Sequence, residues 1–321
     1  MRIIIAPSIR TLCVASSILA PVTTLDFYPA ICTLLIVTLH NVNNTCMELF
    51  MKNALGNLVG IPPRNRKINL NSKYVDCYYK NNPYLTTFWN CLSLLFPQGE
   101  KFFVDSVKNY RGNITDDKLL AEISGFIGQE SFHSREHLSL NDLIQNSGIN
   151  VDIFDADLKF ILDIARKFPP SWQLAATCAL EHYTGIMGHQ LLEDSKHNSN
   201  ILYEYHNLWI WHAIEECEHK AVSYDVYKQV SNSYLLRVII MLAASVVFFA
   251  VVANFYLRML WQKRLTNPIM LLDALLYLGN LFKDLIPNYF EYFKPNFHPL
   301  FEDSSILIDQ WSFKLGLYTP H

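Results

Sequence analysis

The stretch between Arg237 and Arg258 limits the possible folds of this chain more than any other feature. It holds twenty residues, 238–257, without a charge, and only Ser245 and Asn254 interrupt its apolar side chains. A helix of about twenty residues is roughly 30 Å long, which matches the hydrocarbon thickness of a membrane. The alternative is a buried core helix, but such helices seldom run this long without a polar face. The stretch therefore predicts a transmembrane helix.

The composition agrees with a membrane protein and excludes several other classes. Hydrophobic residues make up 51% of the 321 residues and charged residues only 17%, against about 25% charged in ordinary soluble domains. With 11 Gly and 14 Pro, the chain is neither collagen-like nor of low complexity. The net charge of -3, from 26 basic and 29 acidic residues, gives no basis for nucleic-acid binding.

Four segments follow from the distribution of apolar residues. Residues 1–60 form an apolar N-terminal extension, interpreted as a signal peptide, a second anchor or an extended start of the gene. Residues 61–232 form a helical bundle, 233–260 the single transmembrane segment, and 261–321 a C-terminal helical tail. Basic residues flank the transmembrane segment equally, so they do not set its orientation. The seven cysteines lack a Cys-x-x-Cys spacing, which favours free thiols and a bundle in the cytoplasm.

Helical periodicity dominates the region before the transmembrane segment. We expect a helix that begins at Pro97, one from Thr115 through His137, a linking helix over 152–168, one from Ser171 to about Leu192, and one over 200–230. No stretch shows the sustained alternation of a strand. The fold class is therefore all-α, and a four-helix bundle is the simplest arrangement of these helices.

Two of these helices carry a Glu-x-x-His motif on an apolar face. The first motif is Glu130 with His133, and the second is Glu216 with His219, preceded by His212 one turn earlier. Residues three, four and seven apart share one face of a helix. The neighbouring Glu218 points to the opposite side and is expected to lie in solvent.

The other two helices each place a single glutamate among apolar residues. Glu100 lies between Phe96 and Phe103, and Glu181 follows an Ala-rich run. An unpaired carboxylate in such surroundings is strongly unfavourable and requires a cation. One Glu from each of two helices and Glu-x-x-His from each of the other two is the ligand pattern of ferritin-like dinuclear carboxylate bundles. The predicted metal ligands are Glu100, Glu130, His133, Glu181, His212, Glu216 and His219.

Three further residues lie near this face and are expected to support the ligands. They are His137, Glu215 and Thr184. His137 could instead bind a metal, and Glu215 could replace Glu216 as the ligand, although the three-residue spacing prefers Glu216.

Four motifs resemble a bacterial family known as predicted metal-dependent hydrolases. They are FPQGEKFF at 96–103, GFIGQESFHSREH at 125–137, LEHYTG at 180–185 and WHAIEECEHKAVSYDVY at 211–227. The resemblance runs from about Ile61 to Pro299 and implies a metal-dependent activity. The seven-ligand set is also similar to that of the di-iron arylamine N-oxygenases, in which an added histidine on the last helix corresponds to His212.

The sequence leaves three hypotheses for function. The first is a membrane-associated di-iron oxygenase that activates O₂ on a hydrophobic or amine substrate, with two metal ions, expected to be iron, and manganese or zinc as alternatives. The second is a metal-dependent hydrolase that activates water, which the scarcity of cations on the site faces disfavours. The third is a non-catalytic metal-binding membrane protein. Expected partners are a small hydrophobic molecule, O₂ and membrane lipid.

Overall fold

The computed structural model describes residue 56 and residues 59–317. Within these ranges the chain is helical and contains no β-strand, apart from one isolated bridge between Tyr79 and Ile201. The all-α prediction is therefore confirmed. The expected N-terminal extension lies almost entirely outside the described residues, as do Cys13, Cys32 and Cys46.

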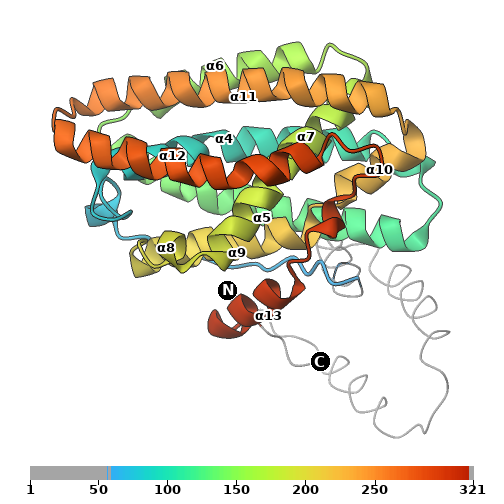
Figure 1. Cartoon of the computed structure of the whole chain (residues 1–321), viewed down its shortest axis with the longest axis horizontal. Helices are drawn as coiled ribbons and strands as arrows, with labels where there is room; N and C mark the ends of the chain where they lie inside the picture. Colours follow the sequence, from blue (N-terminus) through green and yellow to red (C-terminus); the bar gives the residue numbers. More distant parts are fainter. Residues whose placement is uncertain (1–55, 57–58, 318–321) are drawn as a thin grey trace, which may run out of the picture. The chain divides into compact units, whose positions relative to one another are not determined.

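Four long helices form the bundle (Figure 1). They are α4 (Pro83–Lys108), α5 (Asp117–Asn146), α7 (Pro170–Glu193) and α9 (Tyr203–His219). Helix α4 packs against α5, and α7 against α9, while contacts of α4 with α7 and of α5 with α9 close the ring. Asn82 and Asp116 cap the first two helices by accepting hydrogen bonds from backbone N–H groups of the first turn.

The other helices of the described residues pack around this bundle. They are α6 (Val151–Ala165), α8 (Ser195–Asn198), α10 (Val222–Val230), α11 (Tyr234–Lys263), α12 (Pro268–Glu291) and α13 (Ser305–Lys314). Three 3₁₀ turns, η1 (Ser72–Tyr74), η2 (Arg111–Asn113) and η3 (Pro299–Phe301), lie in the connections. Figure 1 shows α11 and α12 running as an antiparallel pair alongside the bundle.

Helix α11 contains the long apolar stretch. It is long and apolar enough to cross a membrane, and one third of its most apolar window is buried inside the protein. The buried side packs against α7 and α4 over most of the helix, from Ile240 near one end to Met259 near the other. This contact leaves the opposite side of α11 uncovered by the described chain.

Helix α4 corrects the expectation that a helix begins at Pro97. The helix begins fourteen residues earlier, at Pro83, and Pro97 lies inside it. Because proline has no N–H, the carbonyl of Ser93 one turn before it loses its partner within the helix. Asn141 of α5 supplies one, since its Nδ2 donates to the Ser93 carbonyl at 3.2 Å. The bundle thus satisfies the group that makes an internal proline unfavourable.

The last predicted helix is also divided. The expected single helix over 200–230 ends at His219, and α10 begins at Val222. Lys220, between the two, is buried and donates through Nζ to the carbonyl of Glu302 at 2.6 Å and to Ser304 Oγ at 3.0 Å. A periodic sequence does not reveal this break, because it depends on a partner about 80 residues further along the chain.

Candidate metal centre

The bundle brings the seven predicted ligands into its interior. Glu100 comes from α4, Glu130 and His133 from α5, Glu181 from α7, and His212, Glu216 and His219 from α9. Each of these residues is at most 4% exposed. Such burial is rare for glutamate unless a cation or hydrogen bonds compensate the charge.

Six of the seven residues form two groups with the geometry of metal sites. The ligand atoms of Glu100, His133, His212 and Glu216 lie within 4.8 Å of one another, as do those of Glu130, Glu216 and His219. Both groups contain Glu216, whose Oε1 lies 2.8 Å from His212 Nε2 and whose Oε2 lies 3.5 Å from His219 Nε2. A carboxylate shared in this way is suited to bridge two cations.

Glu181 belongs to neither group but lies beside the second. Its Oε2 is 3.5 Å from His219 Nε2. Glu130 Oε1 is 3.4 Å from the same nitrogen. The structure therefore places Glu181 at the edge of the cluster, where a small movement of its side chain would let it reach a cation held by Glu130 and His219.

The polar atoms of the cluster lack the partners that buried groups require. Both carboxylate oxygens of Glu130 and of Glu181, and Nε2 of His219, are buried without a hydrogen-bond partner among the described residues. An unsatisfied buried polar group costs about 1–3 kcal/mol, and more when it is charged. A cation among these atoms would satisfy all of them at once, so the donor set fits a metal.

Two of the three candidate histidine ligands, His212 and His219, are hydrogen-bonded through their second ring nitrogen, and the third, His133, has a carboxylate close to that nitrogen without a hydrogen bond. His133 Nε2 lies 3.0 Å from Glu215 Oε2, His212 Nδ1 lies 2.6 Å from His137 Nε2, and His219 Nδ1 lies 2.9 Å from Gln129 Oε1. The nitrogen that remains on each ring faces the glutamates. Metal-binding histidines are oriented in this manner, by a buried acceptor or donor behind the ring.

Burial and neighbouring charges shift the pKa values of the cluster. Burial raises the pKa of Glu130 well above its usual value, and the neighbouring Glu100 carboxylate raises it further. Burial likewise raises the pKa of Glu181 to about 8. For His219, burial lowers the pKa, but the carboxylates of Glu216 and Glu181 outweigh it and raise the pKa to about 9. Protons thus take the place that a metal ion competes for.

The three predicted supporting residues lie in different positions. His137 contacts His212 and also Ser93 Oγ, at 3.0 Å. Glu215 accepts a hydrogen bond from Trp211 Nε1 at 2.8 Å, in addition to its contact with His133. Thr184 donates to the backbone carbonyl of Glu181 at 3.1 Å, within its own helix, and lines the cavity described below.

The sequence interpretation of Glu218 is wrong. Its side chain is only 5% exposed, and Arg64 and Gln129 both donate hydrogen bonds to it. Arg64 also donates to Glu215 Oε1 at 3.1 Å. The polar side of α9 is therefore covered by the segment that precedes the first bundle helix, and not by water.

Four residues of the site were not predicted. Arg64 and Gln129 donate hydrogen bonds to Glu218. Ser134 donates to Glu100 Oε2 at 2.7 Å, and Ser93 contacts His137. Gln129 and Ser134 flank the first Glu-x-x-His motif, and this position in the sequence could have indicated that they lie near the site. Arg64 had none, because it is distant from every motif in the sequence.

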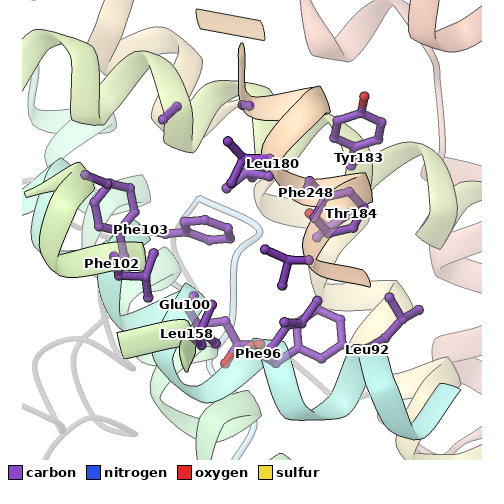
Figure 2. A pocket seen from close by; sticks show the side chains of 18 of the residues that line it. Leu92, Phe96, Glu100, Phe102, Phe103, Leu158, Leu180, Tyr183, Thr184 and Phe248 are labelled. Atoms are coloured by element: carbon purple, nitrogen blue, oxygen red, sulfur yellow. The ribbon is translucent and has the colours of Figure 1, made fainter. Parts of the chain in front are cut away.

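Two cavities reach the cluster. The larger, about 570 Å³, is lined almost wholly by apolar side chains and includes Glu100, His212 and Glu216. Figure 2 shows the carboxylate of Glu100 among Phe96, Leu158 and other apolar side chains of this cavity. The smaller, about 300 Å³, has more polar walls and is lined by Glu181 and Lys220, among others.

Helix α7 separates the two cavities. Leu180, Tyr183 and Thr184 line the apolar cavity, whereas Glu181 and Gly185 line the polar one. Because these residues alternate around one helix, the two cavities approach the cluster from different sides of α7.

Together, the fold and the cluster define an all-helical bundle with a buried Glu/His site suited to metal ions. A family model described as predicted metal-dependent hydrolase matches residues 62–303. The chain belongs to this family. No curated protein and no solved structure matches the chain.

Proposed function

We propose that the protein is a hydrolase that uses two metal ions and acts on a hydrophobic substrate. The observation that carries this proposal is the position of the Glu/His cluster between an apolar and a polar cavity. Hydrolysis needs a substrate and a water at one point, and the two cavities offer separate approaches for them. Membership of the predicted metal-dependent hydrolases supports the same reaction class.

The residues of the cluster divide between two ion positions. Glu100, His133, His212 and Glu216 would hold one ion, and Glu130, Glu216 and His219, joined by Glu181, would hold the other. When bound, the ions would lower the pKa of a water molecule and polarise the bond to be cleaved.

The protein's own residues supply orientation and water exclusion. Glu215, His137 and Gln129 keep the three imidazoles turned so that one nitrogen of each faces the cluster. The apolar walls bind the hydrophobic part of the substrate and keep bulk water away from that side. Water enters along the polar cavity, past Lys220.

Oxygen activation, which was the first hypothesis from the sequence, is the second candidate function. The set of four glutamates and three histidines supports it, because carboxylate-rich bundles of this kind hold iron for reactions with O₂. The apolar cavity supports it as well, since a dry site protects an oxidising centre from side reactions. Under this hypothesis iron and an external reductant are required.

One set of assays distinguishes the two reactions. The metal-free protein is loaded separately with Zn²⁺, Mn²⁺ and Fe²⁺, and each form is tested on acyl esters without O₂. Ester cleavage under these conditions supports hydrolysis. Inactivity on esters, together with O₂ uptake by the Fe²⁺ form in the presence of a reductant, would replace hydrolysis by oxygen activation.

A matched pair of variants on α7 tests the site. Glu181→Gln should lower the bound metal from two ions towards one, because it removes a carboxylate from the second position. Glu193→Gln serves as the control, since Glu193 lies on the same helix and its side chain is 68% exposed. Equal metal content in the two variants would contradict the assignment of Glu181.

We further propose that α11 attaches the protein to a membrane and that the bundle lies on the cytoplasmic side. The length and apolar character of α11 support the attachment. The four described cysteines are free, which suits a reducing compartment. A thiol reagent that does not cross membranes, applied to intact cells, tests the side on which the bundle lies: Leu138→Cys, at an exposed position of α5, should stay unlabelled, and its labelling would contradict the proposal.

A further inference from the structure

The outer side of α11 is exposed and apolar over nearly its whole length. Leu235, Ile239, Leu242, Val246 and Leu257 are each at least half exposed. No charged side chain interrupts this side between Arg237 and Arg258. Monomeric soluble proteins rarely leave so continuous an apolar surface uncovered.

The two helices beside α11 extend the exposed apolar area. Phe255 of α11 packs on Phe154 of α6, and Phe249 of α11 packs on Phe282 of α12. Both neighbours carry further large exposed apolar residues: Phe160 and Ile164 on α6, and Ile269, Leu272, Leu275 and Leu276 on α12.

The ends of this surface carry the residues that suit a membrane boundary. Tyr234 at the start of α11 and Trp261 near its end are exposed, at 46% and 80%. Arg264, three residues after Trp261, is exposed as well, whereas Lys263 forms an ion pair with Asp76. Aromatic rings gather at the interface between lipid and water, and basic groups pair with lipid phosphates there.

The apolar cavity opens on the same surface. Val247 and Ala243 of α11 line the cavity and are exposed, as are Phe168 and Trp172 at the junction of α6 and α7. The other end of the cavity is formed by buried residues of the cluster, including Glu100 and His212. A molecule that enters beside α11 thus reaches the candidate metal site between walls that are almost wholly apolar.

The volume of the cavity suits a long hydrocarbon chain. A methylene group is similar in size to a water molecule, which occupies roughly 30 Å³ in the liquid. The cavity of about 570 Å³ therefore accommodates on the order of twenty such groups. Its walls offer hydrogen-bonding groups mainly at the cluster, where the polar end of such a molecule would lie.

We propose that the outer side of α11 lies against membrane lipid and that the cavity takes a lipid acyl chain, which enters sideways from the bilayer beside Val247 and Trp172. The carbonyl-bearing end of the chain lies at the Glu/His cluster. The reaction at the cluster rests on the proposed function, whereas the binding of a lipid acyl chain in the cavity does not depend on it. A protein partner on this surface would close the mouth of the cavity, whereas lipid supplies the ligand.

Photo-crosslinking of the full chain tests the surface. p-Benzoylphenylalanine replaces either Val246, on the outer side of α11, or Leu138, which is 53% exposed on α5. The chain is placed in vesicles of phosphatidylcholine and phosphatidylglycerol that contain a radiolabelled phospholipid. Irradiation should label the protein at position 246 and not at 138. Crosslinking from position 246 to a second copy or to another part of the chain, without lipid, would overturn the proposal.

Binding of an acyl chain in the cavity is tested separately, with the metal-free protein and cis-parinaric acid, a fluorescent long-chain fatty acid. Ala243→Trp narrows the mouth and should weaken binding about tenfold or more, while Ala250→Trp, on the same helix but outside the cavity, should leave it unchanged. Equal binding by both variants would refute the route beside α11.

The two proposals fail in different ways. Chain binding by the wild-type protein without ester cleavage by any metal form would contradict hydrolysis and leave the lipid route intact. Metal-dependent cleavage of short esters, with no binding of cis-parinaric acid, would contradict the lipid route and leave hydrolysis intact.

Discussion

Arg64 forms a bidentate ion pair with the carboxylate of Glu218. Its Nη1 lies 2.7 Å from Oε2, and its Nη2 lies 2.6 Å from Oε1. The same Nη1 lies 3.1 Å from Glu215, which in turn contacts His133. A residue that precedes the bundle thereby stabilises two buried acids on α9 and orients a candidate metal ligand.

The first prediction concerns this arginine. Arg64→Met should lower the free energy of unfolding by about 3–5 kcal/mol, because it leaves two buried carboxylates without their cation. Urea denaturation of the detergent-solubilised protein measures the change. Lys101→Met is the control, since Lys101 forms an exposed pair with Asp105 and should change stability by about 0.5 kcal/mol or less. Similar losses in the two variants would show that the Arg64 network contributes little.

The second prediction concerns Gln129, which holds His219 from behind. Its Oε1 accepts a hydrogen bond from Nδ1 of His219, so that Nε2 is left free to bind a metal. Gln129→Leu should reduce metal affinity about 10–100-fold, the usual effect of removing such a partner. Gln145→Leu, at an exposed position of the same helix, is the control. Competition with a chromogenic chelator measures both, and unchanged affinity in Gln129→Leu would exclude this positioning role.

The sequence was sufficient to predict the general fold and the composition of the cluster. Helix periodicity and the two Glu-x-x-His motifs are local signals, and they predicted the all-α fold and led to seven residues that the structure brings together. Whether these residues bind metal stays a prediction. Local signals failed where a distant group decides the outcome. Pro97 lies inside a helix, where Asn141 of another helix donates a hydrogen bond to the carbonyl of Ser93.

The environment of α9 shows the same limit. Helical spacing predicted that Glu218 lies in solvent, but its carboxylate is covered by Arg64 and Gln129. A charged residue far from every motif, in a segment without helical periodicity, gives no sign of such a contact. The break between α9 and α10 depends likewise on the remote partner of Lys220.

The third prediction concerns the stability of the metal-free protein between pH 6.5 and 9. Folding raises the pKa of Glu181 from 4.5 to about 8, so its contribution to the free energy of unfolding is present at low pH and is lost as the pH rises to 8. Folding raises the pKa of His219 from 6.5 to about 9, so its contribution is lost as the pH rises through 9. Burial lowers the pKa of His133 and of His137, so their effect on the pH dependence ends above 6.5.

Stability should therefore fall from pH 6.5 to 9, by about 1.4 kcal/mol per pH unit for each proton that only the folded state retains. Because metal binding releases protons, a fixed metal concentration should stabilise the protein more as the pH rises. Thermal unfolding followed by circular dichroism, with and without Zn²⁺, measures both trends. A metal-free protein that becomes more stable towards pH 9 would contradict the assigned environment of Glu181 and His219.

The fourth prediction concerns Pro97 and Asn141. Asn141→Leu removes the donor to the Ser93 carbonyl and should destabilise the protein by about 1–3 kcal/mol, because that buried carbonyl loses its partner. Pro97→Ala restores an N–H that can donate to Ser93 within α4. In the Pro97→Ala background, the loss caused by Asn141→Leu should therefore be smaller by about 1 kcal/mol. A double-mutant cycle by urea denaturation measures this difference, and strictly additive effects would show that Asn141 does not compensate for the proline.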